Sequence, residues 1–279
     1  MTSLRLRSLL YVPGHLEALV AKAGKTETDV VILDLEDAVP LSKKDKARQR
    51  LSQSTAILFE MGKSVAVRIN NDDAMVEDDL EAAAAVRPDL LILPKVESQA
   101  FVRQVAQFLH HEGCSDTSLV ALIETPIGLV NAVEIAASHD KLIALNLGTE
   151  DFSLEMGMEP EWDGLLYPSQ QIVIAARSAN KIPLGYAGSI ANFGNIEAFE
   201  TIVHRSAKLG FEGGFAIHPN QIHTLNSVFT PSENDRMQAQ RIIKAAEQSF
   251  EQGLGAVSLD NNMIDRPVIE RARRLLNRS

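Results

Sequence analysis

The sequence contains little cysteine, few aromatic residues and no long apolar run. Each of these shortages excludes certain classes of protein. Its single cysteine, Cys114, excludes an internal disulfide and, without a histidine-rich neighbourhood, makes a poor zinc site. With 5% aromatic, 45% hydrophobic and 23% charged residues, the 279-residue chain has the composition of a soluble globular α/β protein. No run reaches the roughly 18 uncharged apolar residues of a membrane span, and no signal-peptide region precedes the first predicted strand. We therefore expect a cytoplasmic protein with no membrane partner.

Basic residues are also in the minority. The chain has 27 Lys and Arg against 37 Asp and Glu, which gives a formal net charge of −10. Nucleic acid is therefore not an expected partner, because phosphate binding needs a basic face. A phosphorylated cofactor is not excluded, since basic residues gather near both ends of the chain, at Arg5 and Arg7 and within 271–278. The second group also suits a solvated helix end.

What the sequence does contain is a series of short Val/Ile/Leu-rich runs, each followed by a helical pattern. Such runs predict strands that are buried on both faces. We expect strands at 8–13, 30–36, 64–70, 90–95, 119–124, 142–148, near 182–188 and at 213–219. Helices are expected at 15–23, 43–61, 77–86, 97–112, 126–138, 168–180 and 195–209, with an acidic insert at 149–164.

Eight strand–helix units predict an α/β fold of the (β/α)₈ TIM barrel type, with a doubly wound sheet as the alternative. The barrel would occupy residues 1–229. Residues 230–279 would form a C-terminal extension with one long helix at 233–253, a glycine-rich break and a short tail. This segment is too short for a core of its own, so we expect it to dock on the barrel or on a neighbouring subunit.

Polar side chains recur where the predicted strands end, which is where barrels and open sheets place their sites. They are Asp34, Glu36, Asp37, Arg68, Asn70, Lys95, Glu124, Asp151 and His218. Two carboxylates on neighbouring strands, Glu124 and Asp151, suit a hard ion such as Mg²⁺, and the cations suit a negative substrate. Each residue alone also has an ordinary explanation as a helix cap or an ion-pair partner. For His218 we favour a hydrogen-bonded structural histidine.

Several longer strings resemble the citrate lyase β-subunit-like proteins of the HpcH/HpaI aldolase superfamily. They are RSLLYVPG, VVILDLEDAVP with KKDKAR, AVRIN, LILPKVES, ALIETPIGLVNAVEIA, LNLGTEDF, GFEGGFAIHPNQI and NNMIDRPVIERA, in order from residue 7 to residue 272. The resemblance implies a (β/α)₈ barrel of the phosphoenolpyruvate/pyruvate type with a C-terminal helical lid, commonly assembled as a homotrimer.

The resemblance also implies an activity. A carbon–carbon lyase of this kind uses Mg²⁺ to cleave a short 3-hydroxy-carboxyacyl-CoA into acetyl-CoA and a 2-oxo acid. Citramalyl-CoA is our first choice of substrate, followed by malyl-CoA and citryl-CoA. Two alternatives stay open: a β subunit of a citrate lyase complex that acts on a citryl thioester of an acyl carrier protein, and a thioesterase of the malyl-CoA type.

Site residues follow from the same resemblance, position by position. Glu124 and Asp151 would bind the metal directly, and Glu36 and Asp37 would contact it through water. Arg68 would bind the substrate carboxylate and the developing oxyanion. Asp265 would be the catalytic acid/base, brought to the site of a neighbouring subunit. The phosphates of coenzyme A would meet basic residues near the first two strands, namely Arg7, Lys22 and Arg48.

The residues alone allow other interpretations at two of these positions. Lys95 could form a Schiff base as an aldolase lysine does, but nearby acids favour an ion pair. Asp265 could be a helix N-cap, because Pro267 suits the first turn that would follow it. Asn192 and Asn195 stand where many relatives carry acids, and Gly214 stands where a lysine is usual. These departures leave the acyl group open.

Overall fold

The computed structural model describes residues 4–191, 193–251, 257–260 and 262–276. The chain divides into two compact units, Met1–Ser227 and Val228–Ser279. That the second unit is a lid stays a prediction. No helix in the described ranges is long and apolar enough to cross a membrane.

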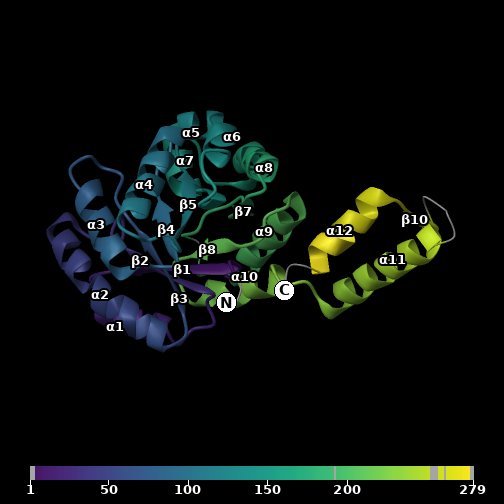
Figure 1. Cartoon of the computed structure of the whole chain (residues 1–279), viewed down its shortest axis with the longest axis horizontal. Coiled ribbons are helices and arrows are strands. Elements are labelled where there is room, and N and C mark those ends of the chain that lie inside the picture. Colours follow the sequence, from purple (N-terminus) through teal and green to yellow (C-terminus); the bar gives the residue numbers. More distant parts are fainter. Residues whose placement is uncertain (1–3, 192, 252–256, 261, 277–279) are drawn as a thin grey trace. The chain divides into compact units, whose positions relative to one another are not determined.

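All eight predicted strands are present, and they form one parallel sheet in the first unit (Figure 1). They are β1 (Ser8–Pro13), β2 (Val30–Asp34), β3 (Ser64–Arg68), β4 (Leu90–Leu93), β5 (Ser118–Ile123), β6 (Leu142–Leu147), β7 (Ile182–Leu184) and β8 (Gly214–Ala216). The order is β7-β6-β5-β4-β3-β2-β1-β8. Beside β7 and β8, backbone bonds join Gly185 to Gly213 and Glu212 to Pro183, which closes the sheet. The predicted (β/α)₈ barrel is confirmed.

Helices follow the strands, with α2, α3, α4, α6 and α8 outside them in Figure 1. The helices of this unit are α1 (Glu17–Ala23), α2 (Lys44–Glu60), α3 (Val76–Val86), α4 (Gln99–His111), α5 (Pro126–Val130), α6 (Ala132–Ala136), α7 (Thr149–Met156), α8 (Trp162–Ser178), α9 (Ile196–Leu209) and α10 (Asn220–Val228), with a short 3₁₀ turn, η1 (Leu41–Lys43). One helix at 126–138 was a wrong prediction, because Asn131 is not helical and separates α5 from α6.

The acidic insert was also predicted wrongly. Residues 149–156 form α7, and Gly157, at φ 65°, ends it as a left-handed cap. The next helix begins at Trp162 rather than at 168, because Pro168 lies inside α8 instead of opening it. Asn195 does have an ordinary role, since its side chain accepts a hydrogen bond from the N–H of Ala198 and caps α9. Asn192 lies outside the described residues.

Every second residue of a barrel strand points inward, and these residues form the core of the first unit. The buried cluster includes Leu9, Ile32, Ala66, Ile92, Leu122, Ala144, Leu184 and Phe215. Two residues further along their strands, the same inward face continues with Asp34, Arg68, Glu124 and Asn146. The alternation of the strands therefore places a polar layer directly on top of an apolar core.

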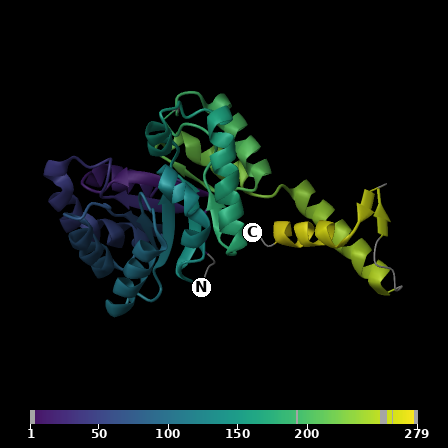
Figure 2. The ribbon, with the colours of Figure 1, turned by 90° about the horizontal axis from the view of Figure 1, so that it is seen from above.

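The second unit contains more regular structure than the predicted helix and tail. Helix α11 (Glu233–Glu251) is followed by an antiparallel hairpin of β9 (Val257–Leu259) and β10 (Asn262–Ile264) and then by α12 (Arg266–Leu276). Within this unit α11 and α12 pack against each other, crossing in the view of Figure 2. Ala246 of α11, Ile264 of β10 and Ile269 of α12 form a small buried apolar cluster.

Candidate active site

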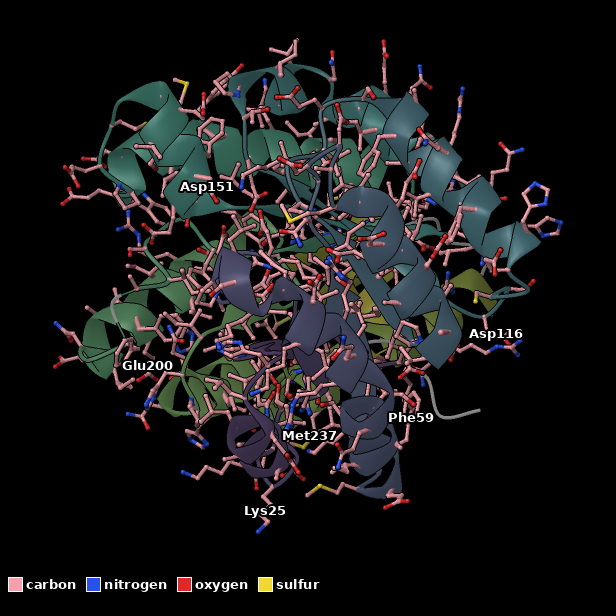
Figure 3. All side chains as sticks on the ribbon, turned by 90° about the vertical axis from the view of Figure 1, so that its left-hand side faces the viewer. Lys25, Phe59, Asp116, Asp151, Glu200 and Met237 are labelled. Carbon is pink, nitrogen blue, oxygen red and sulfur yellow. The ribbon has the colours of Figure 1, made fainter. Side chains whose placement is uncertain are left out.

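A cavity of about 430 Å³ lies at the carboxyl ends of the barrel strands. Its lining includes four of the predicted site residues: Asp37, Arg68, Glu124 and Asp151. A fifth, Glu36, lies against Arg68. Asp151 is labelled in Figure 3, on the teal ribbon of α7. The fold thus brings together residues from three strand ends and one helix.

Arg68, the last residue of β3, is held by acids that follow β2. Its Nε and Nη2 donate to the two carboxylate oxygens of Asp34, both at 2.7 Å. Its Nη1 lies 2.7 Å from Glu36 and 3.3 Å from Asp37. The guanidinium also stacks on the ring of Tyr11, 4.5 Å from its centre. A bidentate pair with a fully buried carboxylate fixes the plane of Arg68 in the cavity wall.

Glu36 links Arg68 to Lys95. One carboxylate oxygen contacts the guanidinium, and the other accepts a hydrogen bond of 2.8 Å from the Lys95 ammonium. Burial alone would lower the pKa of Lys95, but the hydrogen bond and the charge of Glu36 outweigh it and raise that pKa. A lysine that stays protonated is a poor nucleophile. The contacts favour the ion-pair interpretation of Lys95 over a Schiff base.

Glu124 is a buried carboxylate, 4% exposed, at the end of β5. Burial raises its pKa, the negative charges of Glu36 and Asp151 raise it further, and the backbone N–H of Lys95 lowers it, so that the pKa is about 8. Gly148 makes room for this side chain, because a Cβ at Gly148 would lie 2.4 Å from Cγ of Glu124. The glycine of the LGTED string is therefore required by the carboxylate beside it.

Asp151 is the third residue of α7 and is partly exposed. Its charge contributes to the raised pKa of Glu124, which means that the two carboxylates interact. Among the described residues, no three His, Cys, Asp or Glu side chains form a metal-binding group. Mg²⁺ needs only one or two protein carboxylates when water and substrate oxygens complete its shell. Burial and neighbouring acids oppose the ionisation of Glu124, and a bound divalent cation would offset this repulsion. Glu124 and Asp151 therefore suit the predicted metal.

A buried lysine supports the loop that carries Glu36, and sequence reasoning missed it. The ammonium of Lys44, on α2, donates to the carbonyls of Leu35 and Glu36 and to Oδ1 of Asn70, at 2.7, 2.8 and 2.7 Å. Asn70 in turn donates to Asp79 at 2.6 Å. Nothing in the polar run around Lys44 distinguishes it from its solvated neighbours. Tyr11 and Asn146, which also line the cavity, were missed as well.

The residues predicted to contact coenzyme A are not among those that line the cavity. Arg7 precedes β1, at the opposite end of the strands from Arg68, and it binds Asp29 through its side chain. Arg48 binds Asp79 and Asp45. Lys22 is exposed on α1. A phosphate of coenzyme A would have to compete with carboxylates for Arg7 and Arg48. The contacts of coenzyme A with Arg7, Lys22 and Arg48 stay predictions.

Asp265 lies in the second unit, where it caps α12. Its carboxylate accepts a hydrogen bond of 3.3 Å from the N–H of Val268, and its carbonyl accepts one of 3.1 Å from Ile269. The helix-cap interpretation is confirmed, and the acid/base role stays a prediction. His218 accepts a bond from the N–H of Asn220 and stacks on Phe193, as expected of a structural histidine.

Comparisons with known proteins agree with this architecture. Residues 7–219 match the family model described as HpcH/HpaI aldolase/citrate lyase. The chain is 33% identical to the citrate lyase subunit beta of Leuconostoc mesenteroides subsp. cremoris, over 97% of this chain and 92% of that protein. It is 32% identical to a (3S)-malyl-CoA thioesterase of Cereibacter sphaeroides, over 97% and 93%.

A solved structure is also similar over the whole length. It is the CitE protein of Mycobacterium tuberculosis in complex with magnesium, acetoacetate and coenzyme A. The TM-score is 0.78 at 28% identity, with coverage of 100% of this chain and 99% of that one. RipC from Yersinia pestis, at a TM-score of 0.68 and 28% identity, covers 84% of this chain.

Proposed function

The chain belongs to the HpcH/HpaI aldolase/citrate lyase family, and from that premise we propose that it is a Mg²⁺-dependent carbon–carbon lyase. Its proposed substrate is a short 3-hydroxy-carboxyacyl-CoA, with citramalyl-CoA first and malyl-CoA or citryl-CoA next. The observation that supports this most is that Glu124 and Asp151 line one cavity together with the fixed guanidinium of Arg68. The magnesium and coenzyme A bound to the similar CitE protein are consistent with it.

The chemistry requires one carbon–carbon bond to break and a proton to move at each of the two fragments. The substrate hydroxyl loses its proton to a base, its C–O bond becomes the carbonyl of the 2-oxo acid, and the adjacent C–C bond breaks. The electron pair passes to the acetyl thioester, whose α-carbon takes up a proton. A bound Mg²⁺ ion would supply polarisation of the C–O bond.

The protein's own residues position these groups. Glu124 and Asp151 would hold the metal, and Glu36 and Asp37 would contact it through water. Arg68 uses Nε and one N–H of Nη2 for Asp34, which leaves the second N–H of Nη2 for a substrate oxygen. Asp265 is the proposed acid/base, and a neighbouring copy in a homotrimer is the proposed source of that residue.

Two other functions are favoured by particular relatives. The similarity to citrate lyase β subunits over 92% of their length favours a subunit that acts only on a thioester of an acyl carrier protein. The similarity to a malyl-CoA thioesterase favours hydrolysis of the thioester without cleavage of the carbon chain.

A product assay separates the three. Purified protein with Mg²⁺ is given citramalyl-CoA, malyl-CoA or citryl-CoA, and acetyl-CoA, 2-oxo acid and free hydroxy acid are measured separately. The lyase yields acetyl-CoA and a 2-oxo acid in equal amounts. Free malate or citramalate indicates the thioesterase. No turnover of any free CoA ester would overturn the free-CoA lyase and favour the carrier-bound subunit.

A further inference from the structure

Asn146 is a buried amide beside two leucines of the barrel interior. It lies on β6 with 6% of its surface exposed, and it lines the cavity. Its partners in the strand register are Leu122 of β5 and Leu184 of β7, both buried and both in the interior cluster. A polar side chain between two leucines is unfavourable unless something satisfies it.

The amide has no partner in the part of the chain that the structure describes. Its side chain makes no hydrogen bond there, although one amide can make up to four. The neighbouring polar groups of the floor are satisfied by protein: Tyr186 donates to the carbonyl of Phe215 at 2.9 Å, and Glu124 accepts from Lys95 at 2.6 Å. Among the described residues, Asn146 therefore presents to the cavity an amide that no protein group bonds.

The backbone nearby is shaped to admit this amide. Gly185 has a φ of 123°, and a Cβ at that position would lie 2.7 Å from Oδ1 of Asn146. The glycine leaves the amide oxygen its place between β6 and β7. The local backbone therefore accommodates the amide of Asn146 even though no described protein group bonds it.

We propose that Asn146 is a substrate-specificity residue, whose amide hydrogen-bonds an oxygen of the part of the substrate that becomes the 2-oxo acid. This inference rests on the proposed lyase function. Coenzyme A is too large for a cavity of about 430 Å³, so its chain must leave through the mouth and the small acid portion must reach the floor. The cavity offers this portion leucine and aromatic side chains, the carboxylates around Glu124, the guanidinium of Arg68 and this amide. The amide provides directed hydrogen bonding without adding charge beside Glu124.

Replacing the amide of Asn146 by an apolar side chain of similar shape tests the contribution of its hydrogen bond to substrate binding. Asn146→Leu removes the hydrogen bond and packs against Leu122 and Leu184, and Asn146→Ala serves if the larger side chain does not fit. We expect the affinity for pyruvate in the presence of Mg²⁺, measured by calorimetry, to fall about 10- to 100-fold, which is the range for a hydrogen bond to a charged group. Affinities for Mg²⁺ alone and for coenzyme A should change less than about two-fold.

The melting temperature gives a second readout. A residue kept for structure destabilises the fold when it is replaced, whereas replacement of an amide that lines the cavity and has no protein partner should leave the melting temperature nearly unchanged. Asn131→Leu is the matched control, because it makes the same change at an amide whose partner is the carbonyl of Glu97. It should leave pyruvate affinity unchanged.

The outcomes separate this inference from the function on which it rests. Equal pyruvate affinity in the wild type and in a folded Asn146→Leu or Asn146→Ala protein would overturn the inference alone. A fall in Mg²⁺ affinity as large as the fall for pyruvate would also overturn it, because the residue would then act through the metal. No binding of pyruvate, oxaloacetate or glyoxylate, the 2-oxo acids expected from the three candidate substrates, by the wild-type protein would overturn the lyase function together with the inference.

Discussion

The backbone N–H of Lys95 donates a hydrogen bond to the carboxylate of Glu124, with 2.6 Å between the nitrogen and Oε2. Lys95 has a φ of 48°, in the left-handed region that non-glycine residues seldom adopt. Its ammonium binds Glu36 at the same time. One residue therefore contacts the proposed metal ligand through its main chain and the acid partner of Arg68 through its side chain.

Removal of either proposed ligand should abolish metal binding without unfolding the barrel. Glu124→Gln and Asp151→Asn keep the shape of each side chain but remove the charge that holds Mg²⁺. We expect calorimetry to show no Mg²⁺ binding for either variant and circular dichroism to show native secondary structure. Glu150→Gln is the matched control, because Glu150 adjoins Asp151 but binds Ser189 and Ile190. Normal Mg²⁺ binding by both ligand variants would contradict the assignment.

Glu124 makes the stability of the metal-free protein depend on pH. Its folded pKa, about 8, lies above the ordinary value of 4.5, so the folded state holds a proton that the unfolded state releases between these values. The resulting stability is fully present below pH 4.5 and is lost as the pH rises through 8, a contribution of a few kcal/mol. Chemical unfolding from pH 5 to pH 9 should show this decline, and Glu124→Gln should flatten it. An identical slope in the two proteins would refute the prediction.

Lysine should not replace Arg68 in its bidentate pair with Asp34 without loss of stability. Arg68→Lys keeps the charge but loses the planar fork, and it leaves part of a buried carboxylate unsatisfied. We expect unfolding to require about 2 to 4 kcal/mol less free energy, together with a large loss of turnover. Arg50→Lys makes the same change at an exposed pair with Glu17 and should stay within about 0.5 kcal/mol. Equal effects of the two substitutions would show that burial does not matter here.

Lys44 should matter more than the exposed lysine two residues after it. Lys44→Met leaves three buried acceptors without their donor, so we expect a loss of about 2 to 3 kcal/mol in urea unfolding. Lys46→Met, at an exposed position of α2, should be near neutral. If the two variants are equally stable, the loop that carries Glu36 does not depend on this ammonium.

These residues show which parts of the site can be predicted from sequence. Strand positions follow from apolar runs, and the two-residue period of a strand places Arg68 and Glu124 inward above the core. The asparagine at position 146 interrupts an apolar run, a signal that could have indicated a cavity residue. Lys44 carries no such signal, because its burial depends on how α2 packs against the loop after β2 and against Asn70. Helix α7 was missed because its acids and the following glycine also fit a loop.

Asp265 combines a confirmed structural role with a proposed catalytic one, and a single substitution can separate them. Asparagine is as good an N-cap as aspartate, so Asp265→Asn should keep the hydrogen bond to the N–H of Val268 and leave the stability of α12 unchanged. It cannot donate and accept a proton as a carboxyl group does. We therefore expect Mg²⁺ binding and melting temperature to stay at wild-type values while turnover falls by about 10²-fold or more. Asp265→Ala should lose the same turnover and also destabilise the helix by about 1 kcal/mol. Full turnover in the asparagine variant would leave Asp265 with the cap as its role.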